Sequence, residues 1–88
     1  MISQNVTVTN QTGIHARPAA LFISAAAKFK SEITVGKGAK RGNAKSLLNI
    51  LSLGISKDSE ITISAEGEDE KEAVAQLVEL VGSKFGEA

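Results

Sequence analysis

The sequence contains no cysteine, tryptophan or tyrosine, and it has only one histidine and one proline. Without cysteine there is no disulfide framework and no thiol chemistry, which fits a reducing compartment, and we expect a cytoplasmic protein. One histidine without cysteine excludes an ordinary structural zinc site. Because the three phenylalanines are the only aromatic residues, the core must be mainly aliphatic. We expect no bound metal and no cofactor.

The sequence also lacks an excess of one charge and any long apolar run. Ten basic residues balance ten acidic ones, so nucleic acid is not favoured as a partner. No apolar run approaches the roughly 18 residues of a membrane span, and residues 1–5 lack the basic and apolar regions of a signal peptide. We therefore expect no insertion into a membrane. The length of 88 residues predicts a single domain over 1–88.

The stretch at residues 12–20 is the most unusual part of the chain. It holds His15, Arg17 and Pro18 within four residues. The fixed φ and the missing N–H of Pro18 suit the first turn of a helix. Helix formers follow, and the spacing of the apolar residues among them predicts a helix over about 16–28. His15 is therefore expected at or just before a helix N-terminus.

The expected position of His15 has chemical consequences. The first N–H groups of a helix, here those of Ala16 and Arg17, have no partner within the helix, and with the helix dipole they attract anions. An imidazole there tends to stay neutral and is then a nucleophile at cytoplasmic pH. These N–H groups and the Arg17 guanidinium would hold a phosphoryl group on the ring. The alternative is an ordinary surface or capping histidine, with Arg17 and Pro18 only beginning the helix.

The remaining chain predicts short strands and helices. Alternating apolar residues predict strands near 2–9, 31–35, 40–43 and 60–65, and helical spacing predicts further helices near 47–53 and 69–86. The charges and glycine of the third strand are typical of a protected sheet edge. Asp69, with Glu72 three residues later, is typical of an N-cap and capping box. The order β-α-β-β-α-β-α predicts an α+β fold: an open-faced β-sandwich with a four-stranded, mostly antiparallel sheet and three helices on one face.

The helix near 47–53 carries more leucine than two turns can bury. Ser46 before it is typical of an N-cap, and Gly54 after it is typical of the residue that follows a helix. Leu48 and Leu51 lie to the side of the expected buried face and are candidates for exposure. Exposed leucines beside a reactive group suggest a docking surface, although single exposed leucines are also ordinary.

Three segments together resemble the HPr family, the histidine-containing phosphocarriers of the bacterial phosphoenolpyruvate-dependent sugar phosphotransferase system. They are residues 13–19 with the Gly-Ile-His-Ala-Arg-Pro-Ala motif, residues 44–54 beginning Ala-Lys-Ser-Leu-Leu, and residues 61–67. Length and element order agree with the family from end to end. The first motif together with the Lys-Ser segment at this spacing is specific. The resemblance implies an HPr-like fold and a protein substrate rather than an enzyme.

The resemblance implies a relay through His15. Enzyme I, itself phosphorylated from phosphoenolpyruvate, donates a phosphoryl group to the Nδ1 atom, and His15 passes it to the EIIA domain of a sugar permease. Arg17 would neutralise charge during transfer, and the N–H groups of Ala16 and Arg17 would bind the phosphate. We expect a monomer that meets its partners on one surface. The candidates for the apolar part of that surface are Ala20, Leu21, Leu47, Leu48 and Leu51.

The resemblance also places Ser46 at a position that an ATP-dependent HPr kinase phosphorylates in part of the family, with transcriptional regulators as further partners. Capping explains Ser46 without such regulation, and Leu48 and Leu51 stand where many kinase-regulated members carry methionine. Two other functions remain open. One is a paralogue in a nitrogen-regulatory branch, and the other is a small ligand-binding or RNA-binding module. The second needs stacking aromatics, whereas this chain has only phenylalanines in helical stripes.

Overall fold

The computed structural model describes residues 1–9, 14 and 16–86. The predictions for His15 and for the loop at 10–13 lie outside the described residues. The elements in chain order are β1 (Ile2–Thr7), α1 (Ala16–Ala26), β2 (Glu32–Lys37), β3 (Lys40–Asn43), α2 (Leu47–Ser52), β4 (Glu60–Glu66), α3 (Glu70–Gly82) and a short 3₁₀ turn, η1 (Lys84–Gly86). This order confirms the predicted β-α-β-β-α-β-α arrangement.

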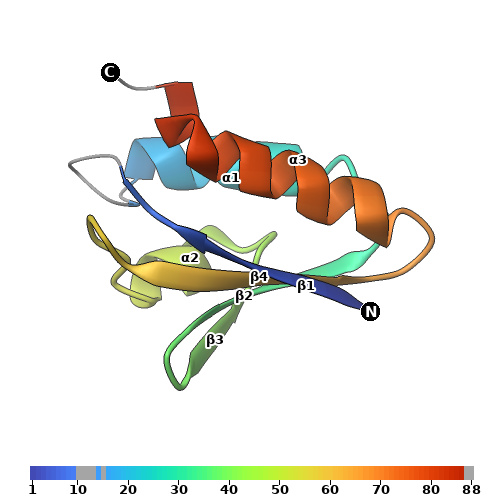
Figure 1. Cartoon of the computed structure of the whole chain (residues 1–88), viewed down its shortest axis with the longest axis horizontal. Coiled ribbons are helices and arrows are strands. Elements are labelled where there is room, and N and C mark those ends of the chain that lie inside the picture. Colours follow the sequence, from blue (N-terminus) through green and yellow to red (C-terminus); the bar gives the residue numbers. More distant parts are fainter. Residues whose placement is uncertain (10–13, 15, 87–88) are drawn as a thin grey trace.

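The four strands form one antiparallel sheet in the order β1-β4-β2-β3. Figure 1 shows α1 and α3 lying across the same face of this sheet. The shorter α2 packs against α1 and against β3. β3 is an edge strand, as its charges and glycine predict. The predicted fold class is therefore confirmed.

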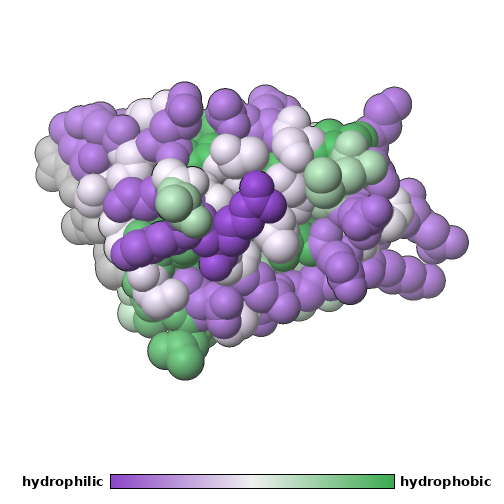
Figure 2. Space-filling model, turned by 90° about the horizontal axis from the view of Figure 1, so that it is seen from below, coloured by the Kyte–Doolittle hydropathy of each residue, from purple (hydrophilic) through white to green (hydrophobic). Residues whose placement is uncertain are grey.

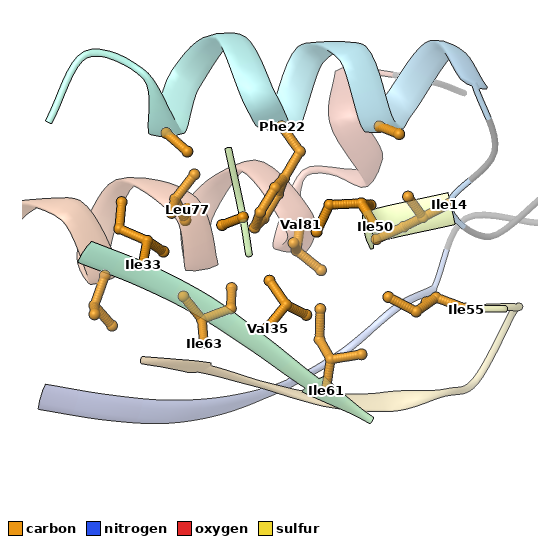
Figure 3. Close-up of a cluster of buried hydrophobic side chains, with 14 of the residues drawn as sticks. Ile14, Phe22, Ile33, Val35, Ile50, Ile55, Ile61, Ile63, Leu77 and Val81 are labelled. Carbon is orange, nitrogen blue, oxygen red and sulfur yellow. The ribbon is translucent and has the colours of Figure 1, made fainter. Parts of the chain in front are cut away.

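The core lies between the sheet and the helices. Because side chains alternate along a strand, Ile61 and Ile63 of β4 both point toward the helices and are fully buried. Phe22 of α1 and Leu77 of α3 meet them from the opposite layer (Figure 3). Full burial of one such side chain contributes about 1.5–3 kcal/mol, so these contacts hold both long helices on the sheet.

The other face of the sheet is polar. Two hydrogen bonds link β1 and β4 across it: the Ser3 and Ser64 hydroxyl oxygens lie 2.8 Å apart, and Thr62 Oγ1 donates to Asn5 Oδ1 at 2.7 Å. Figure 2 looks at the molecule from this side and shows hydrophilic residues over the middle of the face. None of the described helices is long and apolar enough to cross a membrane.

The bounds of several elements differ from the prediction by a few residues, and the differences that matter most lie in α1 and α3. α1 ends at Ala26 rather than near residue 28, although Phe29 beyond it is still buried. α3 ends at Gly82, and Phe85 reaches the core from η1 with a φ of 57°. Asp69 is the N-cap residue of α3, as predicted, but the capping box is wrong, because the Asp69 side chain makes no hydrogen bond to its own helix. Its carboxylate binds the loop that follows α1 instead.

Candidate functional site

Ile14 and Ala16, the two neighbours of His15 in the sequence, belong to the described residues, whereas His15 itself does not. Ile14 is 6% exposed, and its N–H donates a hydrogen bond to the carbonyl oxygen of Ile55 at 3.0 Å. Figure 3 shows Ile14 and Ile55 together at one end of the core. Ala16 is the first residue of α1. In the sequence, His15 therefore lies between the buried residue Ile14 and the first residue of α1.

The first turn of α1 has the features that the sequence predicts. Pro18 lies in this turn and is buried, while Ala16 and Arg17 are exposed. The N–H groups of Ala16 and Arg17 have no partner within the helix because of their position. The first turn of α1 carries no acidic side chain, whereas that of α3 carries Glu70 and Glu72. An anion that approaches α1 therefore meets the positive end of the helix dipole without a competing carboxylate.

The chain that follows α2 is hydrogen-bonded to Ile14, the residue before His15. Gly54 follows α2 with a φ of 63°, a left-handed conformation that suits glycine after a helix and confirms its predicted role. Lys37 Nζ donates a hydrogen bond to the Gly54 carbonyl oxygen at 2.7 Å. The next residue, Ile55, pairs with Ile14. Sequence reasoning missed this link, because the only signal for it is an apolar residue directly after the helix-ending glycine.

Five exposed residues of α1 and α2 are the predicted contact residues, and we call them the apolar patch. α1 and α2 pack against each other. Leu48 is 78% exposed, whereas Ile50 and Leu53 of the same segment are buried. Leu47, the first residue of α2, shares a face with Ile50 and Leu53 by spacing but is 46% exposed. The apolar patch consists of Ala20, Leu21, Leu47, Leu48 and Leu51.

Ser46 caps α2, as predicted. Its backbone is extended, with φ −116° and ψ 116°. Its Oγ accepts hydrogen bonds from the backbone N–H of Asn49 at 3.4 Å and from Asn49 Nδ2 at 2.9 Å. The side chain is half-buried. Ser46 thus has a structural role in the unmodified protein.

The described residues contain no group of three or more His, Cys, Asp and Glu side chains that would suit a metal ion. Two carboxyl groups have altered pKa values, and both lie at the start of α3. The hydroxyl of Ser31, followed by the N–H of Lys30, lowers the pKa of Asp69. The N–H of Gly67, followed by the amino group of Met1, lowers the pKa of Glu70. These shifts arise from hydrogen bonds that join structural elements.

Comparisons with known proteins identify the family. A family model described as the PTS HPr component phosphorylation site matches residues 2–83. The chain is 44% identical to the HPr-like protein Crh of Bacillus subtilis over 92% of this chain and 95% of Crh. It is 46% identical to the phosphocarrier protein HPr of Haemophilus influenzae, with the same coverage of 92% and 95%.

Solved structures agree with these relatives. A crystal structure of HPr-C-His from Thermoanaerobacter tengcongensis superposes with a TM-score of 0.97 at 51% identity, covering 100% of this chain and 99% of that one. A crystal structure of an HPr dimer from the same organism has a TM-score of 0.79 at 55% identity, covering 91% of this chain and 92% of that one. Because this relative forms a dimer, the monomeric state that we expect for this chain stays a prediction. Fold, element order and sequence together show that the chain belongs to the HPr family of the phosphotransferase system.

Proposed function

We propose that this protein carries a phosphoryl group on His15, received from phosphorylated enzyme I and passed to the EIIA domains of sugar permeases. Membership of the HPr family supports a phosphocarrier of the phosphotransferase system. The observation that carries the residue assignment is the start of α1, which follows His15 directly and begins with the exposed residues Ala16 and Arg17. In this role the protein is a substrate of its partners and does not turn over alone.

The transfer forms one bond to phosphorus and breaks another. The lone pair of neutral His15 Nδ1 attacks phosphorus in line, and the bond between phosphorus and its donor breaks toward the donor. The phosphoryl group is highly anionic along this path. The unpaired N–H groups of Ala16 and Arg17 and the helix dipole stabilise that charge. The reverse arrangement, with His15 as the leaving group, delivers the phosphoryl group to EIIA.

Arg17 is exposed, so it can reach a partner's phosphoryl group as well as one held on this protein. A guanidinium presents paired N–H donors that match two phosphate oxygens and stays charged at every physiological pH. It adds stabilisation where charge develops without burying the phosphate. A buried phosphate would be hard to pass on, whereas an exposed one remains accessible to the next acceptor.

We propose that the apolar patch is the centre of the surface that enzyme I and EIIA share. Donor and acceptor must reach the same histidine, so their contact areas overlap. Leu48 and Leu51 belong to α2, whose end is joined to Ile14 through Ile55. Exposed leucines near a charged transfer site provide apolar area that a partner can bury.

We further propose that Ser46 is a site of regulatory phosphorylation by an HPr kinase/phosphorylase, with transcriptional regulators as readers of the modified form. The similarity to Crh, which a solution structure describes as the catabolite repression HPr of Bacillus subtilis, supports a regulatory role of this kind. A phosphate on Ser46 would add negative charge beside the apolar patch and weaken the docking of acidic partners. The test is incubation with HPr kinase and ATP: wild type should gain an acid-stable phosphate, and Ser46→Ala should gain none.

The phosphocarrier proposal is tested by incubation with enzyme I and phosphoenolpyruvate. The wild-type protein should gain one acid-labile phosphate, and His15→Ala should gain none. Addition of different EIIA domains to the phosphorylated protein then separates two branches. Fast transfer to a sugar-specific EIIA supports sugar uptake, whereas transfer only to a nitrogen-regulatory EIIA supports the regulatory paralogue. Incorporation that survives in His15→Ala would contradict the residue assignment.

A further inference from the structure

A hollow of about 440 Å³ lies where the start of β2, the strand β3 and the start of α2 meet. Small-molecule sites commonly have volumes of about 300–1,000 Å³, so the hollow has the size of a metabolite site. The polar and basic residues that line it include Lys30, Ser31, Thr34, Arg41, Asn43 and Lys45. None of these residues belongs to the first turn of α1 or to the apolar patch.

The hollow lies in the most basic part of a chain whose net charge is zero. The segment at residues 28–45 has the single acidic residue Glu32, which also lines the hollow. The basic residues of this segment are Lys28, Lys30, Lys37, Lys40, Arg41 and Lys45. Glu66 pairs with Glu32 across β4 and β2, and the carboxylate of Asp69 is occupied by hydrogen bonds from Lys30 and Ser31. The lining therefore favours an anion.

The wall of the hollow is held in place by hydrogen bonds. Lys45 Nζ donates to the carbonyl oxygen of Phe29 at 2.6 Å, which links the loop before α2 to the loop after α1. The backbone N–H of Lys45 donates to Asn43 Oδ1 at 2.8 Å, and the N–H of Asn43 donates to Asn49 Oδ1 at 3.4 Å. A site that is formed before its ligand arrives loses less entropy on binding.

We propose that this hollow binds a small phosphate monoester that carries hydroxyl groups, such as a sugar phosphate. The guanidinium of Arg41 and the ammonium of Lys30 would bind the phosphate oxygens. Thr34 offers a hydroxyl, and Asn43 offers an amide, as partners for the hydroxyl groups of the ligand. A ligand with one negative charge would need only one of these cations, whereas a dianionic phosphate can bind to both.

The proposed site is separate from the phosphoryl-transfer site. Lys30 and Ser31 follow the C-terminal end of α1, while Ala16 begins its N-terminal end. A helix of 11 residues is about 16 Å long at 1.5 Å per residue, so the two ends are well apart. Ligand binding in the hollow therefore leaves the start of α1 open to enzyme I.

Amide chemical shifts of the full chain, measured by NMR during titration, test the proposal. The probes are glucose 6-phosphate, inorganic phosphate and glucose. Glucose 6-phosphate should cause saturable shifts confined to residues 30–34 and 41–45. Inorganic phosphate should bind more weakly because it lacks the hydroxyl groups, and glucose should cause no shifts. Equal affinity for inorganic phosphate and glucose 6-phosphate would contradict the proposed ligand class.

Variants that replace a cation with a neutral side chain test which residues bind the phosphate. Arg41→Gln and Lys30→Gln should each weaken the binding of glucose 6-phosphate at least about tenfold, since each removes a charge-assisted hydrogen bond. Lys57→Gln is the matched control, because Lys57 is exposed and does not line the hollow. All three variants should still accept phosphate from enzyme I, which separates this proposal from the phosphocarrier proposal.

Three results would overturn the proposal. The first is the absence of saturable shifts with glucose 6-phosphate. The second is an equal loss of affinity in Lys57→Gln, which would indicate a general charge effect. The third is a loss of affinity in Arg41→Gln without a loss in Lys30→Gln. Arg41 also borders a second hollow beside Glu60 and Thr62, whereas Lys30 does not, so this result would place the ligand in the second hollow. Shifts with an acidic peptide but not with glucose 6-phosphate would point to a protein partner and would equally overturn it.

Discussion

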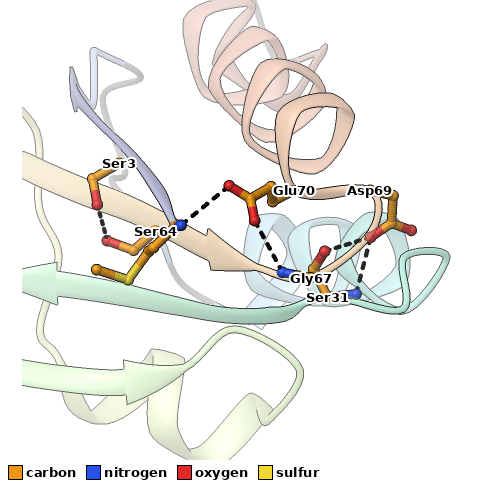
Figure 4. Close-up of polar contacts among 7 residues, drawn as sticks. Ser3, Ser31, Ser64, Gly67, Asp69 and Glu70 are labelled. Carbon is orange, nitrogen blue, oxygen red and sulfur yellow. Dashed lines mark hydrogen bonds and ion pairs between the residues drawn. The ribbon is translucent and has the colours of Figure 1, made fainter.

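Asp69 binds Ser31 across the fold and thereby ties the loop after α1 to the start of α3. The backbone N–H of Ser31 donates to Asp69 Oδ1 at 3.0 Å, and the Ser31 hydroxyl donates to the same oxygen. The N–H of Lys30 donates to Oδ2 at 2.9 Å. Figure 4 shows the Asp69 carboxylate beside Ser31, with Glu70 binding Gly67 close by. One carboxylate thus satisfies three donors of a loop between α1 and β2.

These hydrogen bonds predict a pH dependence of the unfolding free energy. They stabilise the ionised form of Asp69 and lower its pKa below the ordinary value of 3.8. A carboxyl group whose pKa is lower in the folded state stabilises the fold above its unfolded pKa, and this contribution is lost as the pH falls through the folded pKa. The unfolding free energy should therefore decline from about pH 5 downward.

Urea unfolding of Asp69→Asn checks this expectation. The variant should be less stable than wild type at neutral pH, and the difference should shrink as the pH falls below about 4. Glu68→Gln is the control, because it removes the neighbouring exposed carboxylate and leaves the bonds to Ser31 intact. A constant difference at every pH would show that the ionisation of Asp69 does not carry the effect.

Gly67 should not tolerate a side chain. Its φ is 151°, and an added Cβ would lie 2.7 Å from Ser31 Cα, so the backbone would have to shift. Gly67→Ala should lower the unfolding free energy by about 1–3 kcal/mol. Gly82→Ala is the matched control, because nothing lies within 4 Å of its Cβ position and it ends α3. That change should be neutral or stabilise by up to about 1 kcal/mol. Equal effects in calorimetry would contradict the close approach at Gly67.

Arg17→Ala should slow phosphoryl transfer without unfolding the protein. Arg17 is exposed, so its loss should change the unfolding free energy by less than about 1 kcal/mol. Rapid-quench measurement of transfer from enzyme I should give a clearly lower rate, because a charge opposite the phosphoryl oxygens is gone. Lys28→Ala, beyond the other end of α1, should keep the wild-type rate. Equal rates for the two variants would remove Arg17 from the transfer step.

Leu48→Glu should weaken partner binding and leave the fold intact. Leu48 is 78% exposed, so the change should alter the unfolding free energy by no more than about 0.5 kcal/mol. Titration calorimetry with enzyme I should show a reduced affinity, because a charge replaces apolar contact area. Ile50→Ala on the buried side of α2 should behave oppositely, lowering stability by about 2–5 kcal/mol. Unchanged affinity in Leu48→Glu would exclude Leu48 from the docking surface.

The sequence predicted those features that depend on local rules. Pro18 in the first turn of α1, the Ser46 cap and Gly54 after α2 each follow from backbone geometry and hydrogen bonding within a few residues. The alternation in β4 was equally clear, because one face of that strand is buried and the other is polar. Local patterns of this kind need no knowledge of the distant chain.

Features that depend on distant contacts were missed. Asp69 has the sequence pattern of an N-cap, but Ser31 lies near it in space and offers better donors. The pairing of Ile14 with Ile55 likewise joins parts of the chain that no short pattern connects. The hollow lined by Lys30 and Arg41 appears only when β2 and β3 are paired. These contacts require the tertiary fold.

The central claim is that the phosphoryl group resides on His15. The most direct measurement is fragment mapping by mass spectrometry at neutral to alkaline pH, after incubation with enzyme I and phosphoenolpyruvate. We expect one phosphate, and fragmentation should place it on His15 in the peptide that also contains Arg17. Phosphate on any other residue, or none after complete phosphorylation of enzyme I, would contradict the account.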